Sequence, residues 1–312
     1  MRPLAPRTTA DRRLQHLREG AIEGLLRFSA IAAVAGLLLI IVFVFREAWS
    51  IVGNAEARAE AGLRNLFGVP RWQPVSEVPK YGLLPLFAGT IKVVLVAMVF
   101  ATPLGVLAAL FSSEFATPRF RELLKPAIEV LAGIPSVVLG FFALMVLASW
   151  VQGVTGAPFR LNALNAGIAL GLGVLPTIFT VAEDALRAVP RSYREASLGL
   201  GATPWQTAWN VALPAASAGV SAGVLLGLAR AIGETMIVLM ASGNAPITSG
   251  SIFDSARTFS ATIAAELAEV VVGSPHYAAL FFLGAVLFTV TFAINVMAGL
   301  LTERLRRQLA GS

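Results

Sequence analysis

Long runs of apolar residues, separated by shorter polar stretches, are the first feature of this chain. A helix of about 20 apolar residues crosses the ~30 Å hydrocarbon core of a membrane, and a helix satisfies all of its own backbone groups in lipid. The runs therefore predict an all-α integral membrane protein with six transmembrane helices. We expect these helices at about residues 25–45, 83–111, 128–150, 166–185, 215–240 and 277–301.

The polar stretches between the runs predict the loops. Residues 47–81 are rich in Ala and Glu in their first half, which favours a helix there, and we interpret them as an external loop. Residues 114–125 predict an internal loop, and residues 152–165 predict a short external one. We interpret residues 242–275 as an external re-entrant or amphipathic element.

This pattern also predicts how the chain is divided. Gly133-Ile134-Pro135-Ser136 predicts a kink in the third helix, and the glycines of the fourth helix allow a neighbouring helix to approach closely. Those glycines are Gly167, Gly171 and Gly173. We expect an N-terminal tail at 1–24, a first transmembrane helix with its external loop at 25–82, a core of five transmembrane helices at 83–304 and a C-terminal tail at 305–312.

The placement of basic residues predicts the orientation. Lys and Arg exceed Asp and Glu by 24 to 18, and the basic residues gather in the N-terminal tail, in 114–125, in 187–194 and at the C-terminus. Short loops rich in Lys and Arg stay in the cytoplasm. We therefore expect both termini in the cytoplasm of a multi-pass inner membrane protein, and we expect contact with membrane lipid rather than with nucleic acid.

Several kinds of chemistry are excluded by what the sequence lacks. Without Cys the chain forms no disulfide or thiolate metal site, and its two His residues, His16 and His276, lie far apart. There is no Gly-x-x-x-x-Gly-Lys-Ser/Thr loop to bind ATP phosphates. We expect no catalytic residues, no metal site and no cofactor bound by this chain.

The stretch 195–214 is polar and small between two apolar runs. Gly201 allows a break after a first short helix, and Thr203-Pro204 starts a second one. Trp205 and Trp209 then lie one helical turn apart, either to fill a groove of a partner or to rest on lipid headgroups. This composition favours a helix and turn that face another protein.

Fixed offsets in this stretch resemble the cytoplasmic coupling loop of permease subunits of bacterial ABC importers. The resemblance departs only by Ser197 in place of Ala and by Val211 in place of Ile. It implies that an ATPase docks on the segment 187–214, and because this chain lacks a phosphate-binding loop, that ATPase is a separate subunit that binds ATP and Mg. The residues that carry it are Glu195, Ala196, Ser197, Gly201, Val211, Leu213 and Pro214.

The fifth apolar run contains two charged residues. Arg230 and Glu234 are four residues apart, which places them on one face of a continuous helix. A charge at the centre of a membrane helix costs about 3 kcal/mol, so such groups face a bundle interior or a water-filled path. The pair either locks two helices together, or Arg230 lines a path and offers its donors to an oxyanion.

The same run narrows the resemblance. Residues 227–236, Gly-Leu-Ala-Arg-Ala-Ile-Gly-Glu-Thr-Met, followed by Gly243-Asn244, are similar to the PstC-type permeases of phosphate-specific importers, over about residues 80–305. The resemblance implies the type I ABC importer permease fold and import of inorganic phosphate by alternating access. It implies a substrate path at Arg230, Glu234, Thr235 and Asn244.

The resemblance also implies partners. These are a PstA-like second permease, a PstB-like ATPase dimer and a PstS-like periplasmic phosphate-binding protein. Two alternatives remain open: a permease for another oxyanion (molybdate, tungstate or sulfate), and a membrane enzyme that acts on lipid phosphates with Arg230 and Glu234.

For the other polar residues we expect structural or surface roles, with one alternative left open at Lys92. Lys92 either reaches the external interface or faces the path. Glu183-Asp184 we interpret as a solvated helix end. Glu266 and Glu269 we interpret as the polar face of an external helix that can contact the binding protein, and His276 as a residue at a membrane interface.

Overall fold

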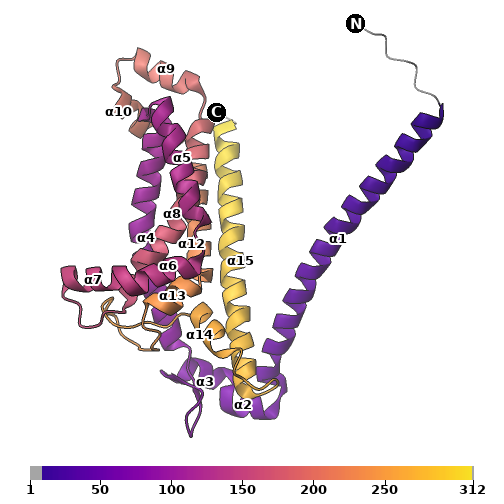
Figure 1. The fold of residues 1–312 in the computed structure, drawn as a ribbon, viewed down its shortest axis with the longest axis vertical. Coiled ribbons are helices and arrows are strands. Elements are labelled where there is room, and N and C mark those ends of the chain that lie inside the picture. The colour runs from indigo at the N-terminus through magenta and orange to yellow at the C-terminus, as the bar shows by residue number, and fades with distance from the viewer. Residues whose placement is uncertain (1–8, 311–312) are drawn as a thin grey trace.

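The computed structural model describes residues 9–310, which form a bundle of helices (Figure 1). The long helices are α1 (Thr9–Gly53), α4 (Leu84–Leu110), α5 (Pro118–Gly133), α8 (Ala163–Ala188), α12 (Ser217–Gly233) and α15 (Pro275–Ala310). The short helices are α2 (Ala55–Ala61), α3 (Leu63–Gly68), α6 (Ser136–Phe142), α7 (Ala148–Thr155), α9 (Arg191–Gly199), α10 (Pro204–Thr207), α11 (Leu213–Ala215), α13 (Met236–Ala241) and α14 (Phe259–Glu266). The π-helical turns η1 (Phe111–Phe115), η2 (Ala143–Leu147) and η3 (Ala208–Ala212) continue α4, α6 and α10, and β1 (Trp72–Gln73) pairs with β2 (Lys80–Tyr81).

The prediction of an all-α membrane protein is confirmed. Within residues 9–310, five helical segments are long and apolar enough to cross a membrane: Ile22–Gly53, Leu84–Phe115, Ser136–Thr155, Ala163–Ala188 and Pro275–Glu303. A sixth is counted if Pro204–Ala215 and Ser217–Gly233, which meet at 70°, form one bent span. The predicted second, fourth and sixth helices agree with α4, α8 and α15 within a few residues at most boundaries.

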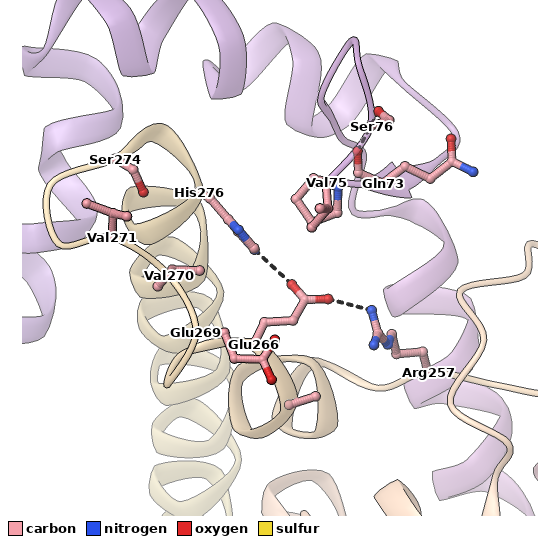
Figure 2. Close-up of a pocket in the computed structure, with 12 residues that line it drawn as sticks. Gln73, Val75, Ser76, Arg257, Glu266, Glu269, Val270, Val271, Ser274 and His276 are labelled. Carbon is pink, nitrogen blue, oxygen red and sulfur yellow. Dashed lines mark hydrogen bonds and ion pairs between the residues drawn. The ribbon is translucent and has the colours of Figure 1, made fainter.

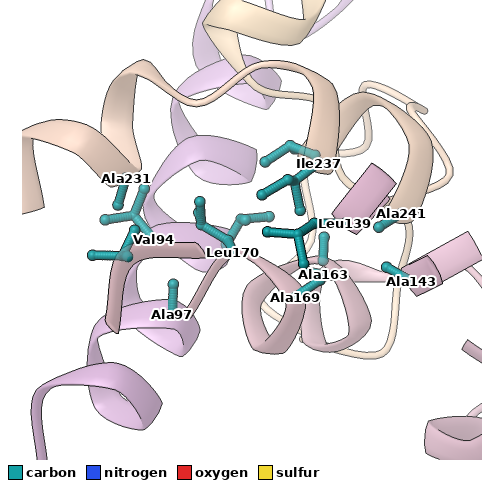
Figure 3. Packing of buried hydrophobic residues seen from close by; sticks show 14 of the residues in the cluster. Val94, Ala97, Leu139, Ala143, Ala163, Ala169, Leu170, Ala231, Ile237 and Ala241 are labelled. Carbon is teal, nitrogen blue, oxygen red and sulfur yellow. The ribbon is translucent and has the colours of Figure 1, made fainter. Parts of the chain in front are cut away.

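The centre of the bundle is the packing of α4, α8 and α12. A Cβ atom added to Gly171 would lie 2.8 Å from Cδ1 of Phe100, and one added to Gly227 would lie 2.6 Å from Cγ1 of Ile178. Helices in lipid associate by close packing, which small residues permit. Around these contacts Leu170 lies near Val94 (Figure 3).

The third predicted helix, 128–150, is wrong as a single element. Helix α5 already begins at Pro118, inside the predicted internal loop 114–125, where the Thr117 hydroxyl accepts a bond from the Phe120 N–H. The chain then leaves the helix at Ile134, whose backbone is extended as expected for a residue before a proline. The predicted kink is thus a full break, after which α6 and α7 lie crosswise to α4 and α8 (Figure 1).

The fifth predicted helix, 215–240, is also interrupted. Helix α12 ends at Gly233, and Glu234 has an extended backbone with φ −69° and ψ 135°. Ser260 of α14 donates from its hydroxyl to the Glu234 carbonyl at 2.7 Å, which satisfies an acceptor that the helix leaves open. Helix α13 begins two residues later, at Met236.

The two ends of the bundle differ. Helices α9 and α10 lie at one end, together with the last turns of α15, whereas α2, α3 and α14 lie at the opposite end (Figure 1). We call these the α9 end and the α3 end. Helix α1 begins at the α9 end and leans away from α15, and no residue of its most apolar window is buried within the chain.

The loop predicted at 47–81 is helical in its first half, as α2 and α3 show. Its second half forms a short hairpin that was not predicted, with Trp72 opposite Tyr81. Of the predicted N-terminal tail, residues 1–8 lie outside the described residues, and the helix of α1 includes the remainder. Helix α15 likewise continues past residue 304 into the predicted C-terminal tail.

Candidate translocation and coupling site

The segment 187–214 folds into a helical hairpin at the α9 end. Gly201 has φ +86°, a conformation that glycine adopts without strain, and it turns the chain between α9 and α10. The Thr203 N–H donates to Gln206 Oε1 at 2.9 Å, and the Gln206 N–H donates to Thr203 Oγ1 at 3.2 Å, which is a capping box. The predicted break and the predicted second helix are both confirmed.

The surface of this hairpin is exposed and partly apolar. Helix α9 buries no residue, and Leu200 beside the turn is 90% exposed. The rings of Trp205 and Trp209 stack with centroids 5.8 Å apart, and Phe115 of η1 lies 5.9 Å from Trp205. We call Leu200, Trp205 and Trp209 with the exposed face of α9 the coupling surface.

The predicted coupling residues occupy different depths in this hairpin. Glu195, Ala196, Gly201 and Pro214 are exposed, whereas Ser197, Val211 and Leu213 are half-buried. The Ser197 and Thr207 hydroxyls lie 2.9 Å apart and bind α9 to α10. The small and polar residues of the motif thus hold the two helices together and leave one face free.

Glu183 is not part of a solvated helix end, contrary to the expectation. It is fully buried, and Ser112 Oγ donates to its Oε1 at 2.8 Å. Lys125 Nζ lies 3.6 Å from Oε2, and an Arg187 nitrogen lies 3.3 Å from Oε1. A buried carboxylate needs such partners, and sequence spacing alone indicated only the last one. Asp184 is exposed, as expected.

Arg230 lies on α12 about 20 Å along the helix from its first residue. Its side chain is exposed, and one guanidinium nitrogen donates to Thr177 Oγ1 of α8 at 3.0 Å. Among the residues that the structure describes, Arg230 forms no ion pair with Glu234. Because the helix ends at Gly233, the two charges no longer share a helix face, and the interpretation of a helix-locking pair finds no support.

The other residues of the predicted path lie beyond this break. Glu234 Oε1 accepts the N–H of Thr235 at 3.1 Å, and Thr235 lines an open cleft of about 450 Å³ against α14. Asn244 has φ +50°, and its Oδ1 accepts from Arg257 Nε at 3.1 Å. Arg230, Glu234, Thr235 and Asn244 therefore follow one another along the α12–α13 break and the next loop. Each makes its own contacts, and the structure does not bring the four side chains together in one site. Thr177 and Arg257 have no local sequence signal that points to these contacts.

A polar cluster at the α3 end is centred on Glu266 (Figure 2). Arg257 donates to its Oε1 at 2.5 Å, and the His276 Nε2 atom lies 2.9 Å from its Oε2. The indole N–H of Trp72 donates to both oxygens at 3.1 Å. The cluster borders an open cleft of about 900 Å³. We call these four residues the Glu266 cluster.

The expectation that Glu266 and Glu269 both lie on an exposed polar face is wrong for Glu266 and agrees with the structure for Glu269. Glu266 is not on a free polar face, because its side chain is only 14% exposed, whereas Glu269 is exposed. Burial alone would raise the pKa of Glu266. Hydrogen bonds from His276 and Trp72 and the charge of Arg257 outweigh burial and hold this pKa below its ordinary value.

Lys92 contacts the loop that follows α13. Its side chain is buried, and Nζ donates to the Ser251 carbonyl at 3.2 Å. This bond joins the first half of α4 to the loop. Beside it, Gly89 faces the backbone carbonyl of Arg257 with no room for a Cβ atom.

Comparison with known proteins gives consistent matches. The model of the family described as the inner membrane component of binding-protein-dependent transport systems matches residues 101–307. The chain is 37% identical to the probable ABC transporter permease protein YqgH of Bacillus subtilis, over 75% of both chains. It is 33% identical to the phosphate transport system permease protein PstC of Xylella fastidiosa, over 98% of both chains.

Solved structures match the fold. A bacterial alginate ABC transporter aligns with a TM-score of 0.62 at 12% identity, over 92% of this chain and 96% of the other. The MetNI methionine ABC transporter, in an inward facing conformation, aligns with a TM-score of 0.53 at 19% identity, over 72% and 94%. At these identities the likeness concerns the fold alone.

Proposed function

The chain belongs to the family of inner membrane components of binding-protein-dependent transport systems, among the PstC-type permeases, and we propose that it carries inorganic phosphate across the inner membrane by alternating access. The proposal is supported by relatives that are named phosphate transport system permeases and match up to 98% of the chain. The fold of a type I ABC importer permease agrees with it.

The observation that carries the proposal is the exposed guanidinium of Arg230 on a helix of the membrane bundle. A charge in contact with lipid costs about 3 kcal/mol, so Arg230 faces a water-filled path or a partner subunit. A guanidinium stays charged and offers paired N–H donors that match phosphate oxygens. The hydroxyl of Thr177, 3.0 Å from Arg230, adds a second polar group at this point of the path.

The rest of the transport cycle assigns roles to the two ends. We place the α9 end, with both termini, in the cytoplasm, where a PstB-like ATPase dimer binds ATP and Mg and docks on the coupling surface. A PstA-like permease completes the path beside α12. A PstS-like binding protein delivers phosphate at the α3 end. Approach of the two ATPase subunits then moves the coupling hairpin, and the path opens alternately to either side.

Uptake of labelled phosphate tests the substrate. Cells that depend on this system are given labelled phosphate with and without excess sulfate or molybdate. We expect phosphate uptake that resists both competitors. Full competition by either anion would instead assign the permease to another oxyanion, with the fold and the coupling surface unchanged.

A further inference from the structure

Arg194 of α9 uses its guanidinium to contact two other helices. Its Nε donates to Glu114 Oε2 at 2.9 Å and one terminal nitrogen donates to Glu114 Oε1 at 2.7 Å. That nitrogen also donates to the Leu186 carbonyl at 2.8 Å, and the other donates to the Val189 carbonyl at 2.7 Å. One side chain therefore joins α9 to the end of α4 and to the end of α8.

Further hydrogen bonds hold the α4 side of the contact in place. Glu114 belongs to η1, the π-helical turn that ends α4, and its side chain is only 9% exposed. Ser113 donates from its hydroxyl to Glu114 Oε1 at 2.9 Å. Arg121 of α5 donates to the carbonyls of Ser112 and Ser113 at 2.8 and 3.0 Å. These bonds fix η1, so that Glu114 offers both oxygens to a planar fork of donors.

The contact on the α8 side satisfies the end of that helix. The last carbonyls of a helix have no partner within it, and basic side chains often bind them. Leu186 lies in the last turn of α8 and Val189 directly follows the helix. Because Arg194 binds both of these carbonyls, a shift of α9 moves the ends of α8 and α4 together.

Without this side chain, α9 has little to hold it against the membrane helices. None of its residues is buried, and its bond to Thr207 through Ser197 holds it to α10, which belongs to the same hairpin. The other contacts of the hairpin with the membrane helices are apolar, with Ala208 and Ala212 of η3 buried in one cluster with Leu110 of α4 and Phe179 of α8, so α9 itself depends on Arg194. Arg194, with 21% of its side chain exposed, is the residue of α9 that contacts both helices through polar bonds within the described chain.

From this geometry we infer that Arg194 and Glu114 are positioning residues, which transmit the displacement of the coupling hairpin to α4 and α8. The inference rests on the proposed importer function and adds to it the route by which ATP hydrolysis reaches the membrane helices. Neither residue touches the substrate or ATP. Their loss should therefore uncouple phosphate import from ATP hydrolysis rather than stop ATP hydrolysis.

The test compares phosphate imported with ATP hydrolysed. The complete complex, with its second permease, ATPase and binding protein, is reconstituted in liposomes with labelled inorganic phosphate. We expect complexes with Arg194→Gln or Glu114→Gln to keep hydrolysing ATP. The phosphate imported per ATP should fall by about 5-fold or more, which is the lower end of the effect of a typical coupling between two sites. Because this ratio is independent of how much complex is folded, a purely structural role would leave it unchanged.

Matched variants sharpen the test. Arg121→Gln removes a positive charge and two hydrogen bonds from the same turn, but Arg121 contacts η1 and not α9. We expect it to lower thermal stability at an unchanged ratio. Arg194→Lys keeps the charge without the fork, so its ratio should be intermediate. The Arg194→Gln/Glu114→Gln double variant should be no worse than the poorer single variant, because the two residues act through each other.

The outcomes distinguish a failure of this inference from a failure of the proposed substrate. If wild type imports phosphate and both glutamine variants keep its ratio, the inference is overturned. If wild type imports no phosphate, the proposed substrate is wrong. The inference is then decided by stimulation of ATP hydrolysis by the binding protein, which needs no known substrate. Stimulation lost in Arg194→Gln and kept in Arg121→Gln supports it, and stimulation kept in both overturns it.

Discussion

Replacing Glu266 with glutamine removes one charge from the Glu266 cluster with almost no change of shape. In the wild type this carboxylate binds Arg257 at 2.5 Å, His276 at 2.9 Å and Trp72 at 3.1 Å. The amide keeps one acceptor oxygen but points an NH₂ group at a donor. Arg257 and His276 are 16% and 15% exposed, so they cannot be fully rehydrated without movement of the loop or of α15.

The expected cost follows from these contacts. A hydrogen bond to a charged group contributes about 1.5–3 kcal/mol, and breaking a fully buried ion pair costs about 3–5 kcal/mol. Because each partner of Glu266 keeps some exposure, we expect the lower part of this range, about 2–3 kcal/mol of unfolding free energy. The assay is thermal unfolding of the purified protein in one detergent, in which the variant should unfold at a lower temperature.

The effect should also depend on pH. The folded-state pKa of Glu266 lies below its ordinary value of about 4.5. The ionised carboxylate therefore contributes stability that is fully present above the ordinary pKa and is lost as the pH falls through the folded-state pKa. Glutamine does not titrate, so the difference between wild type and Glu266→Gln should shrink on acidification.

Glu269→Gln is the matched control. Glu269 borders the same cleft, but its side chain is exposed, so the same loss of charge should change stability by less than about 0.5 kcal/mol. Equal unfolding temperatures for Glu266→Gln and wild type at neutral pH would refute the reasoning. A difference between them that grows on acidification would refute the assigned direction of the pKa shift.

Two further substitutions test the loop after α13. Gly89→Ala places a Cβ atom against the backbone carbonyl of Arg257 and should lower the unfolding free energy by about 1–3 kcal/mol through overpacking. Gly153→Ala, with open space around it, should lower it by nothing, and equal unfolding temperatures for the two variants would contradict this. Lys92→Met removes the bond to the Ser251 carbonyl and should speed proteolytic cleavage of that loop, and cleavage at the wild-type rate would show that the bond does not hold it.

The predicted helices were accurate where the apolar pattern alone decides the fold. Helices α4, α8 and α15 follow long apolar runs, in which nearly all backbone groups pair within the helix even though α4 contains Pro103 and α8 contains Pro176. The third and fifth predicted helices failed at Pro135 and Glu234. At Pro135 the signal was present and was interpreted as a kink rather than a break. At Glu234 the break is stabilised by Ser260 of another helix, and no local pattern indicates that bond.

The candidate site divides in the same way. The turn at Gly201 and the helix that starts at Pro204 were predicted because glycine and proline act within one or two residues. Most partners of Glu183 and Glu266 were not predicted because they lie more than two helical turns away in the sequence, and some of them lie far away, with Ser112 separated from Glu183 by 71 positions and Trp72 from Glu266 by 194. An acidic residue in an otherwise apolar helix gives no indication of its distant partners.

The central claim is that phosphate crosses the membrane along a path lined by Arg230, and phosphate uptake tests it most directly. Initial rates of labelled phosphate uptake are measured for wild type, Arg230→Gln and Arg27→Gln at matched amounts in the membrane. Arg27 is an exposed arginine of α1, the helix that leans away from the bundle, and serves as the control. We expect uptake to collapse in Arg230→Gln and to stay at the wild-type rate in Arg27→Gln. Normal uptake by Arg230→Gln would contradict the account, because phosphate would then cross the membrane without this guanidinium.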